Sequence, residues 1–160
     1  MHYSGQIPET LDPRLARRDA VEFAHGDEFL RYQRISRAKN PADNVHWTLD
    51  EKGRLRVAWY DDATGDRDDP FGAPIPEEPN AKVSGSAVRK IRRLLDRENF
   101  SEADPYQVGE DVKGGDFVVV TARRDGAVHE VIYESVNPEF ETQLLAMLHS
   151  ITDDAASDVR

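Results

Sequence analysis

The sequence predicts an α+β fold of two layers, with a mostly antiparallel sheet of about five strands and two amphipathic helices packed on one face. Two observations support this class: the strand patterns come mainly as hairpins, and two later segments have the apolar spacing of helices. Hairpin strands pair antiparallel, and two helices can cover one face of a small sheet. The chain has 160 residues, which is the length of one domain.

The N-terminal segment, residues 1–27, is predicted to be a peripheral arm. Asp12 and Pro13 favour a helix start, but the apolar residues that follow do not share one helical stripe. The segment Phe29–Arg37 then has the pattern of a strand. Because it is rich in arginine, we expect it near an edge of the sheet.

A single α+β domain is expected over residues 28–152, followed by a polar tail at residues 153–160. A long acidic loop interrupts the domain at residues 61–85, where five Asp precede four Pro. Loops of this length are functional or disordered. A solvated loop is the favoured interpretation, and calcium binding and docking to a basic partner stay open, although the Asp spacing lacks the central Gly and closing Glu of a calcium loop.

The best-determined feature is a hairpin around a three-residue loop, Glu51–Gly53, with Gly53 in a left-handed conformation. This register gathers six apolar side chains on one face: Val45, Trp47, Leu49, Leu55, Val57 and Trp59. The other face then carries His46, Thr48, Asp50, Arg54, Arg56 and Ala58. A two-residue loop would mix the faces, so the hydrophobic pattern selects the longer loop and points both Trp side chains into the core.

The next helix is predicted to open at Ser86. Its apolar stripe contains Val88, Ile91, Leu94 and Leu95. A basic face lies opposite and contains Arg89, Lys90, Arg93 and Arg97. This face could pair with the acidic loops of the chain, with an acidic patch of a partner protein, or with nucleic acid. A loop is expected from about Asn99 to Gly115.

The last zone is predicted to be a second hairpin and a second helix. Strands Phe117–Arg124 and Ala127–Val136 flank Asp125 and Gly126, which favour a type I′ turn. Asn137 and Pro138 then favour a helix start. The core side of that helix is expected to hold Phe140, Leu144, Met147, Leu148 and Ile151. Pairing about the turn places Val118, Val120, Val131 and Tyr133 on one sheet face, and Phe117, Val119 and Ile132 on the other.

The sequence contains none of the motifs that are typical of several catalytic and nucleotide-binding sites. The chain has no Cys, and no HExxH, GxGxxG, P-loop or GxSxG pattern. For His129, a half-exposed strand position or a buried hydrogen bond beside Val131 and Tyr133 is favoured over a catalytic or metal-binding role. We therefore predict that the protein is not an enzyme, and we expect no cofactor and no metal. Its 31 acids against 21 bases, a net charge of −10, disfavour nucleic acid as a partner. The short apolar runs predict no membrane span, and a cytoplasmic location is expected.

Three segments, "VRKIRRLLDRENF", "DFVVVTARRDGAVHEVIY" and "NPEFETQLLAMLHSI", follow one another in the second half of the chain. This organisation, with an early hairpin before it, resembles the emfourin family over about Phe29 to Ile151. Emfourins are small inhibitors of thermolysin-type metalloproteases, so the resemblance implies an inhibitor with such a protease as its partner. The extra arm and the long acidic loop depart from the family pattern, and no inhibitory residue is carried over.

The predicted function is that of a non-enzymatic protein-binding domain, such as a protease inhibitor or an accessory subunit. The expected contact residues are Phe117, Val119 and Ile132, as an exposed apolar strip, together with Arg89 and Arg93 on the basic helix face. The alternative is a small enzyme or a metabolite-binding domain with a pocket between sheet and helices. A purely structural subunit also stays open, and the sequence leaves the oligomeric state undetermined.

Overall fold

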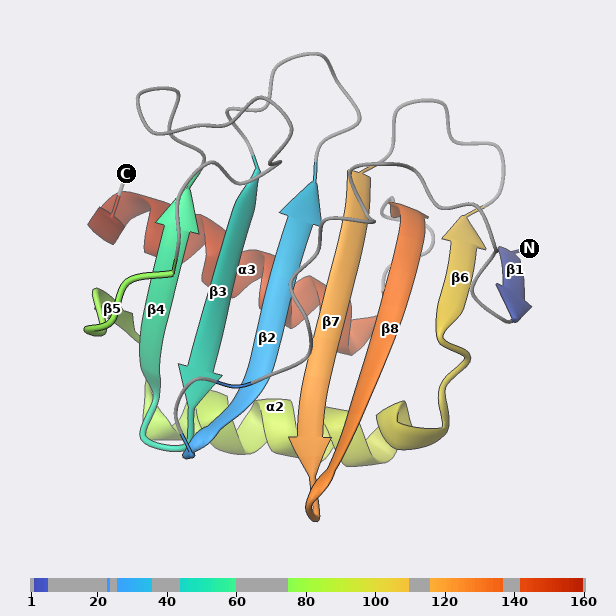
Figure 1. Ribbon diagram of the computed structural model, residues 1–160, viewed down its shortest axis with the longest axis horizontal. Helices are drawn as coiled ribbons and strands as arrows, with labels where there is room; N and C mark the ends of the chain where they lie inside the picture. Colours follow the sequence, from blue (N-terminus) through green and yellow to red (C-terminus); the bar gives the residue numbers. More distant parts are fainter. Residues whose placement is uncertain are drawn as a thin grey trace.

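The computed structural model of the chain describes residues 2–5, 23, 26–35, 44–59, 75–109, 116–136 and 142–159. Within these ranges, eight strands form one sheet in the order β1-β6-β8-β7-β2-β3-β4-β5, with helices α2 and α3 on one of its faces (Figure 1). The strands are β1 His2–Gly5, β2 Glu28–Ile35, β3 Val45–Asp50, β4 Arg54–Trp59, β5 Ala81–Lys82, β6 Tyr106–Gly109, β7 Asp116–Arg124 and β8 Ala127–Val136. The helices are α2 Gly85–Arg97, the 3₁₀ turn η2 Phe100–Glu102, and α3 Gln143–Val159.

The predicted α+β class is confirmed, but the sheet differs from the prediction in detail. It holds eight strands in the described residues where about five were expected. It is also mixed, because β6 pairs parallel with β8 while the other pairs are antiparallel. The parallel pair arises because β8, the second strand of the β7–β8 hairpin, lies between β6 and β7 in the sheet, so the strand beside β6 is not the one that follows it in the chain (Figure 1).

The β3–β4 hairpin has the predicted register. Trp47 pairs with Val57, and Leu49 pairs with Leu55. Gly53 adopts a φ of +84°, the left-handed conformation that its loop position requires. A Cβ at this position would also collide with the backbone carbonyl oxygen of Val83, so two independent constraints select glycine.

The β7–β8 hairpin is confirmed as well. Asp125 and Gly126 have φ values of 52° and 79°, as a type I′ turn requires. Val118 lies opposite Tyr133, and Val120 lies opposite Val131. Positive φ at both central positions explains why an Asp-Gly pair is found here.

Strand β2 lies in the interior of the sheet, so the prediction of a place near an edge was wrong. It pairs with β3 on one side and with β7 on the other, and thereby joins the two hairpins. Arg31 is consequently buried, even though it gave the segment its edge-like composition. The sheet accommodates this charge because the neighbouring positions on the same face are also polar: Thr48 on β3 and Thr121 on β7 lie directly opposite Arg31.

Three short strands lie in segments where none was expected. Strand β6 lies within the predicted loop of residues 99–115, and β5 lies within the predicted loop of residues 61–85. Strand β1, from the predicted arm, pairs antiparallel with β6. Beside β5, the side chain of Asn80 hydrogen-bonds both the N–H and the carbonyl oxygen of Val57, each at 2.9 Å.

Helix α2 begins one residue earlier than predicted, at Gly85. Ser84 is its N-cap, since the Ser84 hydroxyl accepts a hydrogen bond from the backbone N–H of Ala87 at 3.1 Å. The predicted apolar stripe is buried against the sheet, as expected: Val88, Ile91, Leu94 and Leu95. The opposite, basic side of the helix therefore faces away from the core.

Helix α3 is described from Gln143, and the Thr142 hydroxyl accepts a hydrogen bond from the N–H of Leu145 at 3.2 Å. The predicted cap at Asn137 and Pro138, and Phe140, lie outside the described residues. The helix continues to Val159, where a polar tail from residue 153 was expected. Ala155 explains the extension, because it lies one turn beyond Ile151 and is buried in the same core.

The main core lies between the sheet and the two helices. At its centre Trp47 is fully buried, stacks on Tyr32 with ring centroids 5.2 Å apart, and donates its indole N–H to the Thr152 hydroxyl at 3.0 Å. Trp59 is half-buried at the side of the same core, so both Trp side chains face it as predicted. Among the described helices, none is long and apolar enough to cross a membrane.

Side chains on the opposite face of the sheet are buried as well. A smaller apolar cluster forms there around Phe117, Val119 and Ile132. The hairpin residues expected on a polar face are buried with it: His46, Thr48, Asp50 and Arg56. Ion pairs accompany this burial, since Arg56 contacts Glu28 at 3.4 Å and Arg54 contacts Asp50 at 2.6 Å.

Asp50 predicts a specific dependence of stability on pH. Burial acts to raise the pKa of its carboxyl group, but hydrogen bonds from Arg54 and from the N–H of Lys52, with the positive charge of Arg54, outweigh burial and lower the pKa. The unfolded chain therefore takes up this proton at higher pH than the folded protein does. The stabilisation is complete above the unfolded pKa of about 4 and is lost as the pH falls further.

We expect Asp50→Asn to be less stable than the parent protein at neutral pH, with the difference narrowing in acid. Urea unfolding at about pH 7 and about pH 3 measures both differences. Asp104→Asn is the matched control, because Asp104 is exposed and its carboxylate makes no hydrogen bond or ion pair within the described residues. A constant difference across the pH range would show that the Asp50 carboxylate does not act through its charge.

Candidate functional site

The five predicted contact residues do not form one surface. Phe117, Val119 and Ile132 are buried in the cluster on the far face of the sheet, so the expected exposed apolar strip was wrong. Alternation along β7 and β8 correctly placed them together, but it could not show that this face is covered. Arg89 and Arg93 lie on the other side of the sheet, on the exposed side of α2.

The basic face of α2 is exposed and largely unneutralised. Arg89, Lys90 and Arg93 are exposed and make no ion pair with any part of the chain that is described. Their neighbour Arg92 differs, since it contacts Glu51 at 2.7 Å and lies over the ring of Phe29. Internal ion pairing, which was one of the predicted explanations, thus accounts for Arg92 but not for Arg89, Lys90 and Arg93.

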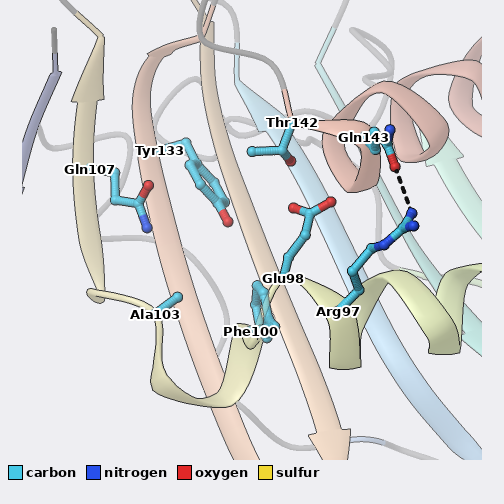
Figure 2. A pocket seen from close by; sticks show the side chains of 8 residues that line it. All are labelled: Arg97, Glu98, Phe100, Ala103, Gln107, Tyr133, Thr142 and Gln143. Atoms are coloured by element: carbon cyan, nitrogen blue, oxygen red, sulfur yellow. Dashed lines mark hydrogen bonds between the residues drawn. The ribbon is translucent and has the colours of Figure 1, made fainter.

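A cavity of about 610 Å³ opens at the C-terminal end of α2 (Figure 2). The end of α2, η2, β6, β8 and the start of α3 surround it. Its apolar walls come from Phe100, Ala103 and Tyr133. The volume is within the usual range of small-molecule sites. The alternative function predicted a pocket between sheet and helices, but the sequence did not indicate that Glu98 and Gln107 line it, because residues 99–115 have the composition of a loop.

Polar side chains line the rest of this cavity, and several are fixed by hydrogen bonds. The Glu98 carboxylate accepts a hydrogen bond from the N–H of Leu144 at 2.9 Å, which ties the end of α2 to the start of α3. Arg97 donates to the side chain of Gln143 at 3.3 Å, and Figure 2 shows its guanidinium turned toward that residue. Gln107 donates to the backbone oxygen of Asp104 at 3.3 Å.

Tyr133 is the most perturbed titratable group of the cavity. Burial raises the pKa of its phenol, and the negative charge of Glu98 raises it further. The hydroxyl therefore stays protonated at neutral pH and cannot act as a general base. Figure 2 shows this hydroxyl pointing toward the Glu98 carboxylate.

His129 lies just outside the cavity and has a structural role. Its Nε2 atom hydrogen-bonds the backbone oxygen of Ala103 at 2.8 Å, and its ring meets Phe100 edge-on at 5.6 Å. His129 is thus a half-buried strand residue with a backbone hydrogen-bond partner. Over the described ranges, no three His, Asp or Glu side chains converge as a metal site. The aspartates considered for calcium, at 61–69, lie outside those ranges.

Comparison of the sequence with models of known protein families found no match. A search of curated proteins likewise found none. Two features of the described residues indicate a function: the basic face of α2 and the cavity at its C-terminal end.

Proposed function

We propose that the chain is a non-catalytic protein-binding domain that takes an acidic segment of its partner along the basic face of α2. One observation carries the proposal: Arg89, Lys90 and Arg93 are exposed and without ion pairs in the described residues, in a chain whose net charge is −10. A local patch of opposite sign on an acidic protein attracts acidic partners and orients them.

The spacing of the arginines supports an extended acidic segment. Arg89, Arg93 and Arg97 follow one another at intervals of four residues, and a helix rises about 6 Å over that interval. Alternate residues of an extended chain are separated by a similar distance, about 6.6 Å. An extended segment with carboxylates at every second position therefore matches the row of guanidinium groups.

The direct test uses a synthetic peptide with Asp at alternate positions and its Asn counterpart. We expect the Asp peptide to bind, with affinity that falls as salt is raised, and the Asn peptide not to bind. Arg89→Gln with Arg93→Gln should weaken binding by about tenfold, since each exposed pair contributes up to about 1 kcal/mol.

The matched control is Ala146→Glu with Ser150→Glu on the exposed side of α3, which changes the net charge by the same amount. Binding by this control should stay near that of the parent protein. Equal weakening in both variants would refute a role for the α2 face and leave only net charge. Light scattering of the free protein detects the competing outcome, in which the acidic segment of a second copy occupies the face.

The finer proposal is that the partner is a thermolysin-type metalloprotease, with the chain as its inhibitor or accessory subunit. It rests on the resemblance to emfourins. Peptide cleavage by such a protease, with and without the protein, is the test. An unchanged cleavage rate at micromolar protein would refute the inhibitor proposal. The proposed binding of an acidic peptide to α2 is tested separately and does not depend on that result.

A second candidate function is binding of a small metabolite. The cavity of about 610 Å³ between the sheet and the ends of the two helices favours it. Both functions can belong to one domain, because Arg89 and Arg93 do not line the cavity.

A further inference from the structure

The cavity at the end of α2 is lined by one negative and one positive side chain, and their positions indicate which charge on a ligand it can bind. Glu98 and Arg97 are consecutive residues of opposite charge, and both line the cavity. In the view of Figure 2 the Glu98 carboxylate lies between the Tyr133 hydroxyl and the Arg97 guanidinium, and Arg97 extends toward Gln143. The negative charge is therefore next to the aromatic wall, and the positive charge is held away from it.

Glu98 retains an oxygen for a ligand. Its Oε2 atom accepts the N–H of Leu144, whereas Oε1 has no hydrogen-bond partner in the described residues. Glu98 and Tyr133 line the same cavity, and the Glu98 charge acts with burial, the larger cause, to raise the pKa of the Tyr133 phenol. The Glu98 carboxylate is therefore available to a cation in the part of the cavity that Tyr133 lines.

A second acceptor lies across the cavity. Gln107 neighbours Tyr133 in the parallel pair of β6 and β8, and it uses its side-chain N–H group on the backbone oxygen of Asp104. Its carbonyl oxygen is then left to accept, and Figure 2 shows this side chain extending toward Tyr133. Two acceptors and two aromatic side chains, Phe100 and Tyr133, are the groups that recognise organic cations.

We propose that this cavity binds the ammonium group of a small organic molecule, with the Glu98 carboxylate as its counter-ion and the Gln107 carbonyl as a further acceptor. The apolar part of the ligand lies against Phe100 and Ala103. A carboxylate on the same ligand can reach Arg97 at the rim. Arg97 is the one residue that this site shares with the basic face of α2, and the site does not depend on the proposed protein binding.

Three probes of the same shape test the charge requirement: phenethylamine, phenethyl alcohol and 3-phenylpropionate. Amide shifts of the ¹⁵N-labelled protein are followed at neutral pH and millimolar probe. We expect phenethylamine to shift the amides of Gln107, Tyr133 and Leu144, and the other two probes to leave them in place. No shift with the amine, or equal shifts with the alcohol or the acid, would overturn the proposal.

Glu98→Gln is the decisive variant, because its amide oxygen can still accept the N–H of Leu144 while the charge is lost. We expect phenethylamine binding to weaken about tenfold or more, as the loss of a charge-assisted hydrogen bond implies. Glu102→Gln removes a nearby exposed carboxylate that does not line the cavity and should bind as the parent does. An unchanged amide spectrum of the free Glu98→Gln protein establishes its fold, and undiminished binding by it would refute Glu98 as counter-ion.

Discussion

Replacement of Trp47 by alanine is expected to lower the free energy of unfolding by about 3–5 kcal/mol, since large core residues cost this much when they are truncated. Trp47 has no exposed surface, stacks on Tyr32, and is joined to α3 by its hydrogen bond to Thr152. The change removes contacts between the sheet and the helix together. Urea unfolding followed by far-UV circular dichroism measures the loss.

Trp47→Phe and Thr152→Val separate packing from the hydrogen bond. Each substitution should lower the free energy of unfolding by less than Trp47→Ala does. The double variant should lose less than the sum of the two single losses, because each single variant leaves one partner of the Trp47–Thr152 hydrogen bond buried without the other. Trp59→Ala is the matched control, since Trp59 faces the same core but is only half-buried. A loss of unfolding free energy for Trp59→Ala as large as that for Trp47→Ala would contradict the position of Trp47 at the centre of the core.

Arg56→Met is the second change with a large expected effect, again about 3–5 kcal/mol, because it removes one partner of a buried ion pair. Arg56 contacts the buried Glu28 carboxylate at 3.4 Å and donates to the backbone oxygen of Glu77 at 2.9 Å. Without the guanidinium, the Glu28 charge is buried in the sheet without this counter-ion. The urea midpoint should fall accordingly.

Addition of Glu28→Gln to Arg56→Met should recover much of the loss, because the double variant also removes the buried negative charge that Arg56 faces. Arg92→Met is the matched control: its pair with Glu51 is exposed, and its removal should cost no more than about 1 kcal/mol. Equal losses for Arg56→Met and Arg92→Met would show that burial does not govern the strength of these pairs.

The two hairpins and both core helices could be predicted from the sequence because their signals are local. Gly53 and the Asp125–Gly126 pair fix the turns, and alternation then fixes the register. The central place of β2 could not be predicted in this way. Composition suggested an edge, whereas the position depends on pairing with two hairpins that are distant in the sequence.

The short strands β1, β5 and β6 carry too few residues for an alternation pattern. Their pairing partners, and not their own sequences, define them as strands. The burial of the polar sheet face could not be predicted for the same reason. Nothing in the sequence near His46 or Thr48 indicates that these side chains are buried.

Of the two parts of the candidate site, one could be predicted from the sequence and the other could not. The basic face of α2 follows from helical spacing alone, so Arg89 and Arg93 were found. The cavity needs the end of α2, the turn after it, β6, β8 and the start of α3 at one place. Glu98 and Tyr133 are far apart in the sequence, and no motif predicts that they line the same cavity.

Asn80 closes the outer edge of β4 to strand addition. An open sheet edge is where extended peptides add a strand, and where amyloid growth begins. Here the carboxamide already occupies the donor and acceptor of Val57, and β5 occupies the neighbouring positions at Arg54 and Leu55. An enzyme cleft that captures its ligands as an extra strand finds no free backbone groups at these three residues, so such a partner must recognise the molecule elsewhere.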